Sequence, residues 1–245
     1  MPYFYFDPWY LIFVLPALLL VLFAQWRVSS TYKKYSRVPN SRGITGVQAA
    51  RSLLDAAGLY DVQIEGARGK LSDHYDPRKK LLCLSQDVAE SASVAALGIV
   101  AHEVGHAQQD RAGDFMLNLR SAMVPAANIG STLGYVFFFV GLLIQGAVGA
   151  TSGMAQVGNM ITWGGIGLFG LAVVFTFITL PVEFGASRRA VQMLQSTGLV
   201  STTELDGVRS VLNAAALTYV AALAQALSQL LYLIFIATGS RRRRD

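Results

Sequence analysis

Long runs without charge dominate the pattern of hydrophobic and polar positions along the chain. No Asp, Glu, Lys or Arg occurs between Asp7 and Arg27, from Ser121 to Val182, or from Ser210 to Ser240. A membrane-spanning helix needs about 20 apolar residues, so the middle run is long enough for two of them. We therefore predict four membrane-spanning helices near residues 9–26, 123–147, 159–181 and 213–237, with a turn in the Gly-rich stretch 146–158.

The composition agrees with this pattern, because 53% of the residues are hydrophobic and only 14% are charged. Trp9, Tyr10 and Trp26 bracket the first run as interfacial aromatic residues do. Asp7, and not a basic cluster, precedes this run, and no small-x-small cleavage site follows it. The first helix is therefore expected to be a retained signal anchor.

The distribution of basic residues predicts the orientation. Arg27, Lys33, Lys34 and Arg37 follow the first run, and no Lys or Arg precedes it. The positive-inside rule then puts the N-terminus outside and residues 27–120 in the cytoplasm. We expect a multi-pass protein of the inner (cytoplasmic) membrane with its active site on the cytoplasmic side. The terminal Arg241–Arg244 opposes this orientation, since four spans place the C-terminus outside. The single Cys83 excludes an intramolecular disulfide and fits a reducing compartment.

The segment between the first two spans has the pattern of a small α+β unit. Apolar residues at helical spacing predict a helix over 45–57, and Gly58 can end it. Residues 61–65 and 80–84 are strand candidates, with a turn at Asp76-Pro77 between His74 and the second strand. A capping-box-like start at Asp87 and Glu90 opens a helix predicted from Val88 to Arg111.

That helix carries His102-Glu103-Val104-Gly105-His106. Histidines four residues apart lie on one helix face and can share a metal ion, with Glu103 beside it as a general base. The residues before His102 are almost all apolar, so buried imidazole and carboxylate groups here need partners, and a metal supplies them. The alternative is a pair of core histidines satisfied without a metal.

A catalytic zinc site usually has three protein ligands. Glu183 is the first charged residue after spans two and three, which return the chain to the side of His106, and an unpaired carboxylate there is costly. The alternative is a carboxylate paired with Arg188 or Arg189. Asp206 is a rival ligand, because Leu205-Asp206-Gly207 echoes the L-D-G motif of site-two-type intramembrane proteases.

Four motifs together resemble the YugP-type family of bacterial membrane-bound neutral zinc metallopeptidases: the histidine motif at 102–106, Leu-Pro-Val-Glu-Phe at 180–184 with Ala-Ser-Arg-Arg-Ala at 186–190, Asp-His-Tyr-Asp-Pro at 73–77, and Ala-Ala-Ala-Leu-Thr-Tyr-Val-Ala at 214–221. The resemblance implies Zn²⁺ held by His102, His106 and Glu183, with Glu103 as the base. The chain is also similar in plan to the HtpX and CAAX-protease metallopeptidases. Gly185 departs from the pattern, since an Asn or similar residue is expected there to support a ligand histidine.

Hydrolysis also needs a donor for the oxyanion that develops on the scissile carbonyl. His74 and Tyr75, beside a predicted strand, are the candidates for this catalytic role. An exposed structural histidine at position 74 is the alternative.

The predicted fold class is a mainly α membrane protein with about four transmembrane helices and a small α+β zincin-like metallopeptidase unit at the membrane face. The predicted divisions are the signal anchor (1–26), the zincin-like region (27–120), a transmembrane hairpin (121–182), the third-ligand segment (183–212), and the fourth transmembrane helix with its basic tail (213–245).

The leading hypothesis is a membrane-anchored zinc endopeptidase acting on membrane or membrane-proximal proteins or peptides. The alternatives are a zinc-stabilised scaffold without turnover and a site-two-type intramembrane protease. The expected partners are a protein or peptide substrate and the lipid bilayer. No nucleic acid is expected, because no aromatic residues interleave with the terminal arginines. The sequence leaves the oligomeric state open.

Overall fold

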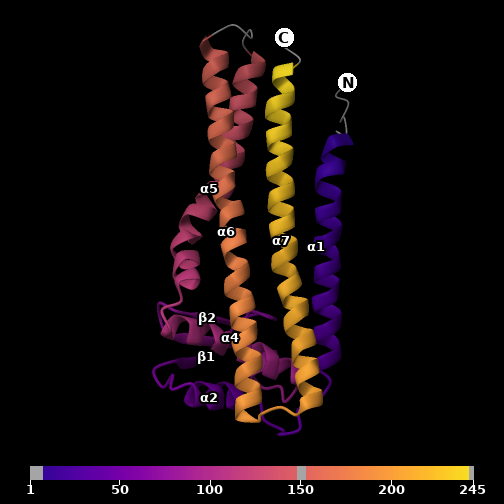
Figure 1. The fold of residues 1–245 in the computed structure, drawn as a ribbon, viewed down its shortest axis with the longest axis vertical. Helices are drawn as coiled ribbons and strands as arrows, with labels where there is room; N and C mark the ends of the chain where they lie inside the picture. Colours follow the sequence, from indigo (N-terminus) through magenta and orange to yellow (C-terminus); the bar gives the residue numbers. More distant parts are fainter. Residues whose placement is uncertain (1–7, 148–152, 243–245) are drawn as a thin grey trace. The chain divides into compact units, whose positions relative to one another are not determined.

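The computed structural model describes residues 8–147 and 153–242 of the 245-residue chain, with side chains to residue 239. Within these ranges the chain is mainly helical with a small mixed sheet (Figure 1). The helices are α1 (Pro8–Tyr35), α2 (Gly46–Ala56), α3 (Gln86–Ala89), α4 (Val94–Arg111), α5 (Phe115–Ala147), α6 (Gly153–Thr197) and α7 (Thr202–Arg242), and the strands are β1 (Gln63–Ala67), β2 (His74–Asp76) and β3 (Leu81–Ser85).

Four of the described helices, α1, α5, α6 and α7, are long and apolar enough to cross a membrane. Each contains one of the four predicted spans, so the prediction of a mainly α chain with four candidate membrane-spanning helices is confirmed. Helix α4, which carries the histidine motif, is not among the candidate spans in the described ranges. Part of the predicted Gly-rich turn and the side chains of Arg241–Arg244 lie outside the described residues.

The chain divides into two compact units, and the first comprises residues 1–22, 119–179 and 220–245. Glycines in this unit let α5 and α6 approach closely. A Cβ atom on Gly165 would lie 2.5 Å from the backbone nitrogen of Phe138, and one on Gly141 would lie 2.5 Å from the carbonyl oxygen of Gly158. Small residues of this kind allow membrane helices to pack backbone to backbone.

The second unit comprises residues 23–118 and 180–219 and contains every residue of the predicted site. Its sheet has the order β1-β3-β2, with β1 parallel and β2 antiparallel to β3. Helices α2 and α4 contact each other, and α4 also contacts β2 and β3. The core between them is built from fully buried aliphatic side chains, including Leu53, Leu82, Leu84, Leu97 and Leu194.

The prediction of one helix from Val88 to Arg111 is wrong, because α3 ends at Ala89 and α4 begins at Val94. Ser93 caps α4 through its hydroxyl group, which accepts from the backbone N–H of Ala96. The intervening backbone binds the segment after α1 instead: Asn40 N–H donates to Ala92, and Val94 N–H donates to Val38. These long-range bonds replace the helical bonds that a continuous helix would have made.

Both predicted strands are present, but each is shifted along the chain, the second from 80–84 to Leu81–Ser85. The first strand covers Gln63–Ala67 in place of 61–65, and the second predicted strand corresponds to β3. His74, predicted in a turn, lies in β2 at the edge of the sheet. The zincin-like character of this unit and the five-part division stay predictions.

Candidate metal centre

The structure brings His102 and His106 of α4 together with Glu183 of α6. The Nε2 atoms of the two histidines lie 3.2 and 3.6 Å from the same carboxylate oxygen, Oε2 of Glu183. One ligand atom from each of the three residues falls within 4.8 Å of the others. The Glu183 side chain is buried, so its charge needs favourable partners at this point.

A glycine inside the histidine motif allows this convergence. A Cβ atom on Gly105 would lie 2.5 Å from the carbonyl oxygen of Ala186, which is closer than real Cβ contacts come. Only glycine lets the α4 backbone lie against α6 at this point. The contact is flanked by His106 on one helix and by Glu183, one turn earlier, on the other.

Gln109 orients His106. Its side-chain nitrogen donates to the Val182 carbonyl at 2.9 Å, so its amide oxygen faces His106 Nδ1, also at 2.9 Å. Because an amide oxygen can only accept, Nδ1 carries the proton. The lone pair of Nε2 then points toward Glu183, as a metal ligand requires.

Ser187 has the corresponding place beside His102, with its Oγ 3.1 Å from Nδ1 of the imidazole. The hydroxyl group accepts when Nδ1 carries the proton, which leaves Nε2 of His102 free to bind a metal. Ser187 lies one turn after Glu183 on α6. The same helix therefore supplies the carboxylate and the side chain that orients the first histidine.

The surroundings of Gly185 explain why position 185 carries no side chain in place of the expected Asn. A Cβ atom at this position would lie 2.7 Å from Nε2 of Gln109. The space that a side chain at position 185 would fill is thus occupied by Gln109, whose amide supports His106. Sequence reasoning missed Gln109 and Ser187, although Gln109 lies at i+3 from His106 on the same helix face.

The donor set fits a zinc ion. Two histidines and one glutamate are a known catalytic set, with ligand atoms at about 2.0–2.2 Å from the metal. Ligand atoms at that distance from a tetrahedral ion lie roughly 3.3 Å apart, close to the 3.2 and 3.6 Å found between the Nε2 atoms and Oε2 of Glu183. Both Nδ1 atoms have partners, so each imidazole presents Nε2 to the same point.

Glu103 lies beside the three ligands and lines a cavity of about 210 Å³ with His102. Burial raises the pKa of the Glu103 carboxyl to about 7; the charge of His102 opposes this rise, and those of Glu183 and Asp73 add to it. The nearby backbone N–H of Tyr75 favours the ionised form and so limits the rise of this pKa. A dication in the site would favour the ionised form again. The other lining residues are Val28, Tyr32, Leu71, Asp73, Ile99, Val211, Leu212, Ala215 and Tyr219.

His74 and Tyr75 are placed differently from each other. The Tyr75 hydroxyl donates to Asp110 at 2.7 Å, and burial together with this carboxylate raises the pKa of the phenol. Lys80 binds the same carboxylate oxygen at 2.5 Å, so Asp110 of α4 anchors β2 and the residue before β3. The exposed His74 places Nδ1 2.8 Å from the Ser72 carbonyl. Neither His74 nor Tyr75 is among the residues that line the cavity.

Other predicted candidates lie outside the cluster. The Asp206 side chain is 77% exposed and pairs with Arg209 at 3.3 Å. Arg189, one of the alternative partners considered for Glu183, pairs with Asp114 at 3.6 Å.

Comparison with known proteins identifies the family of the chain. Residues 10–238 match the family described as "putative neutral zinc metallopeptidase", and the chain belongs to this family. It is also 41% identical over 232 residues to the "putative membrane protease YugP" of Bacillus subtilis (strain 168), a match that covers 95% of this chain and 98% of the relative. No solved structure matches the chain.

Proposed function

We propose that the chain is a membrane-anchored, zinc-dependent endopeptidase that hydrolyses peptide bonds in membrane or membrane-proximal proteins. The observation that carries the proposal is the convergence of His102, His106 and Glu183 with Glu103 beside them on the wall of a cavity. Family membership and the name of the Bacillus relative support the same reaction class.

In this proposal the two imidazole Nε2 atoms and the Glu183 carboxylate hold the zinc ion. When bound, zinc supplies Lewis-acid polarisation of the scissile carbonyl. Gln109 keeps His106 in the tautomer that can bind it, and the Ser187 hydroxyl accepts from Nδ1 of His102 when that imidazole is in the same tautomer.

Glu103 acts as the general base and then as the general acid. Its carboxylate takes a proton from the attacking water and returns it to the amide nitrogen as the C–N bond breaks. The nearby Tyr75 N–H favours the ionised carboxylate that takes this proton. The pKa of about 7 in the chain alone is suited to a group that must both take and release a proton.

The cavity favours an aliphatic substrate side chain next to the scissile bond. Much of its wall is apolar and comes from α1, α4 and α7, including Val28, Ile99, Val211 and Leu212. Burial of such a side chain stabilises the bound peptide by about 1.5–3 kcal/mol. His74 remains our proposed oxyanion donor, whereas Tyr75 contributes through its backbone N–H because its hydroxyl binds Asp110.

Metal analysis and a peptidase assay on the purified full chain test the proposal. We expect about one zinc per chain, lost in His102→Ala and His106→Ala. Glu103→Gln should keep the metal and lose most turnover, because an amide cannot accept the water's proton. Full activity in Glu103→Gln would refute the base assignment. A zinc-loaded wild type without turnover on any membrane-protein substrate would favour the scaffold alternative.

The third ligand is tested by a matched pair of substitutions. Glu183→Gln should reduce zinc affinity and activity, because a neutral amide oxygen is a poorer ligand than a carboxylate. Asp206→Asn removes the other candidate carboxylate and should leave both nearly unchanged. The reverse result would support the site-two-type arrangement.

We further propose that the metal centre faces the cytoplasm at the inner membrane. Single cysteines introduced into Cys83→Ser protein report the orientation in intact cells. A cysteine at Ser41 should be protected from an impermeant thiol reagent, and one at Gly153 should react. The opposite pattern would show that the terminal arginines determine the topology.

A further inference from the structure

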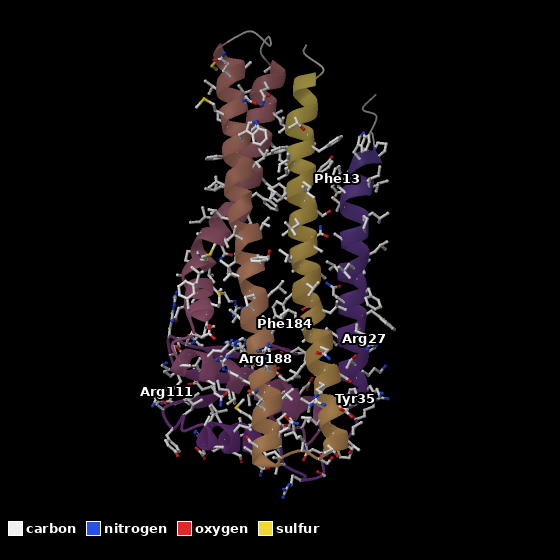
Figure 2. All side chains as sticks on the ribbon, viewed as in Figure 1. Phe13, Arg27, Tyr35, Arg111, Phe184 and Arg188 are labelled. Carbon is white, nitrogen blue, oxygen red and sulfur yellow. The ribbon has the colours of Figure 1, made fainter. Side chains whose placement is uncertain are left out.

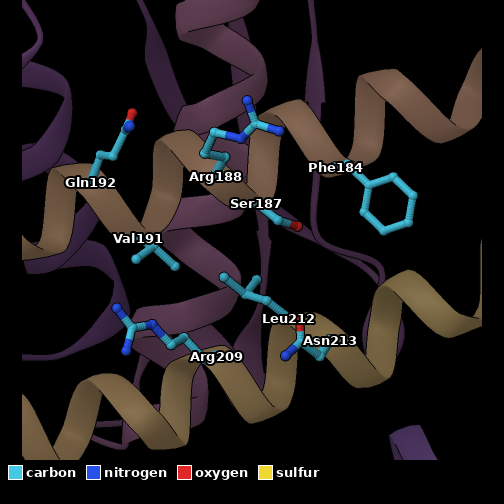
Figure 3. A pocket seen from close by; sticks show the side chains of 8 residues that line it. All are labelled: Phe184, Ser187, Arg188, Val191, Gln192, Arg209, Leu212 and Asn213. Carbon is cyan, nitrogen blue, oxygen red and sulfur yellow. The ribbon is translucent and has the colours of Figure 1, made fainter.

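A second, larger hollow lies between α6 and α7, next to the metal centre. It has a volume of about 530 Å³. Figure 3 shows its lining side chains, which come from the part of α6 after Glu183 and the first half of α7: Phe184, Ser187, Arg188, Val191, Gln192, Arg209, Leu212 and Asn213. We call this hollow the α6/α7 groove. Ser187 lines the groove and also contacts His102, so the groove lies directly beside the candidate metal centre.

The groove carries positive charge from both walls. Arg188 lies on α6 and Arg209 on α7, and none of the lining residues is acidic. Arg209 contacts Asp206 at 3.3 Å, but both side chains are about half exposed or more, so this pair is weak. Arg188, also labelled in Figure 2, makes no hydrogen bond or ion pair within the described residues. Arg209 extends from α7 beside the space between the two helices, whereas the Arg188 guanidinium extends from α6 away from α7 (Figure 3) and reaches an anion in the groove by rotation of its long side chain.

The rest of the lining is apolar or amide-bearing. Val191 and Leu212 point into the space between the two helices, and the Phe184 ring lies at one end (Figure 3). Gln192 and Asn213 add exposed amide groups. An occupant that matches this surface has an anionic group and hydrocarbon in the same molecule.

The position of the groove along α6 matches the depth of lipid headgroups. The predicted span ends at residue 181, and the exposed Phe184 lies three residues later. Arg188 lies seven residues beyond the span end, about 10 Å along the helix at 1.5 Å per residue. The headgroup layer is roughly 5–8 Å thick on each side of the hydrocarbon core, which a flexible arginine side chain can reach.

We propose that the α6/α7 groove binds the phosphate-bearing headgroup of an anionic phospholipid. Arg188 and Arg209 pair with the phosphate oxygens, and Phe184 and Leu212, which lie nearer the predicted spans, contact the glycerol and the first acyl carbons. Basic pockets between membrane helices recognise anionic lipids through this combination, and planar guanidinium groups match phosphate geometry. The groove adjoins the metal centre, because Ser187 also contacts His102 and Leu212 also lines the cavity beside Glu103, but lipid binding does not require peptidase turnover.

Thermal-shift titration of the purified full chain in neutral detergent tests the proposal. The probe is dihexanoyl phosphatidylglycerol below its micelle concentration, with dihexanoyl phosphatidylcholine for comparison. A ligand that binds the folded state raises the melting temperature in a concentration-dependent way. We expect phosphatidylglycerol to stabilise the wild type more than phosphatidylcholine does. The double variant Arg188→Gln/Arg209→Gln should bind it at least about tenfold more weakly, because charge-assisted hydrogen bonds are lost.

The matched control is Arg27→Gln/Arg37→Gln, which removes the same charge from exposed positions on and just after α1. This variant should bind phosphatidylglycerol as the wild type does. Asn213→Asp supplies a second test that does not remove an arginine: its added carboxylate should also weaken binding, at an exposed position that leaves folding intact.

Three results would overturn the proposal. The first is equal phosphatidylglycerol binding by the two arginine double variants, which would mean that the groove does not supply the site. The second is equal stabilisation by inorganic phosphate at the same concentration, which would identify a free-phosphate site. The third is arginine-dependent binding of a triglutamate peptide that displaces the lipid, which would identify a peptide subsite.

Discussion

Gly105 of α4 and Ala186 of α6 are in direct backbone contact, and this contact sets the separation of the two helices that carry the metal ligands. Both residues are buried. The carbonyl of Ala186 belongs to helical backbone and cannot move aside as a side chain could. The distance between the two histidines and Glu183 therefore depends on the absence of a Cβ atom at position 105.

Substitution of Gly105 by Ala should push the two helices apart. Because the Cβ atom would lie 2.5 Å from the Ala186 oxygen, we expect a loss of about 1–3 kcal/mol in the free energy of unfolding, together with weaker zinc binding. Zinc content and thermal unfolding measure both effects. Gly98→Ala is the control on the same helix, since its Cβ would make an ordinary 3.5 Å contact with Val208. If Gly105→Ala bound zinc as well as Gly98→Ala, the contact would not control the site.

Replacing Gln109 by Met should weaken zinc binding by about 10–100-fold, the usual cost of removing a group that orients a ligand histidine. Methionine keeps the volume but leaves His106 Nδ1 and the Val182 carbonyl without their partner. Competition with a chromophoric chelator gives the affinity. Gln108→Met, at the neighbouring and more exposed position, should leave zinc affinity unchanged. Equal affinities in the two variants would contradict the assigned role of Gln109.

Introduction of Asn at Gly185 tests whether Gln109 occupies the place of the side chain expected there. Alone, Gly185→Asn should lower zinc affinity, because its Cβ would lie 2.7 Å from the Gln109 amide nitrogen. In a Gln109→Ala background the same change should be tolerated and should restore part of the affinity. The two effects are thus expected to be non-additive by about 0.5–3 kcal/mol in zinc binding. Simple additivity would show that the two positions do not share one space.

Tyr75→Phe should release β2 from α4 without touching the metal. Loss of the hydrogen bond to Asp110 costs about 1 kcal/mol, and the Tyr75 N–H then holds Glu103 less firmly. We expect unchanged zinc content and a kcat/KM lowered by about threefold to tenfold. Tyr60→Phe is the control, because Tyr60 is 75% exposed. A loss of zinc in Tyr75→Phe would mean that the anchor supports the ligands themselves.

The candidate membrane helices and the histidine motif could be predicted because they depend on local pattern. Charge-free runs identify helices α1, α5, α6 and α7, and the spacing of His102 and His106 puts both on one helix face. Glu183 could be predicted from the cost of a carboxylate at the end of an apolar helix. Each inference needed only neighbouring residues and the general properties of a bilayer.

The errors arose where distant segments decide the local structure. The break between α3 and α4 depends on backbone hydrogen bonds of Ala92 and Val94 with residues 38–40. Helix propensity depends on neighbouring residues only, so it cannot predict these long-range bonds. His74 joins a strand because β3 offers a partner. The role of Gln109 could be recognised only from the structure. One of its two side-chain hydrogen bonds is to the Val182 carbonyl of α6, which the sequence does not place beside α4.

The two helices that form the candidate metal centre are far apart in the chain. His102 and Glu183 lie 81 positions apart, and the segment between them includes α5 and the first part of α6. During synthesis, α4 leaves the ribosome well before Glu183 is made. The nascent chain therefore holds two histidines and a base but no third ligand. The three-ligand site can be completed only after the intervening hairpin has been synthesised and α6 has reached α4, so under the proposed function a partly synthesised chain lacks a complete catalytic centre.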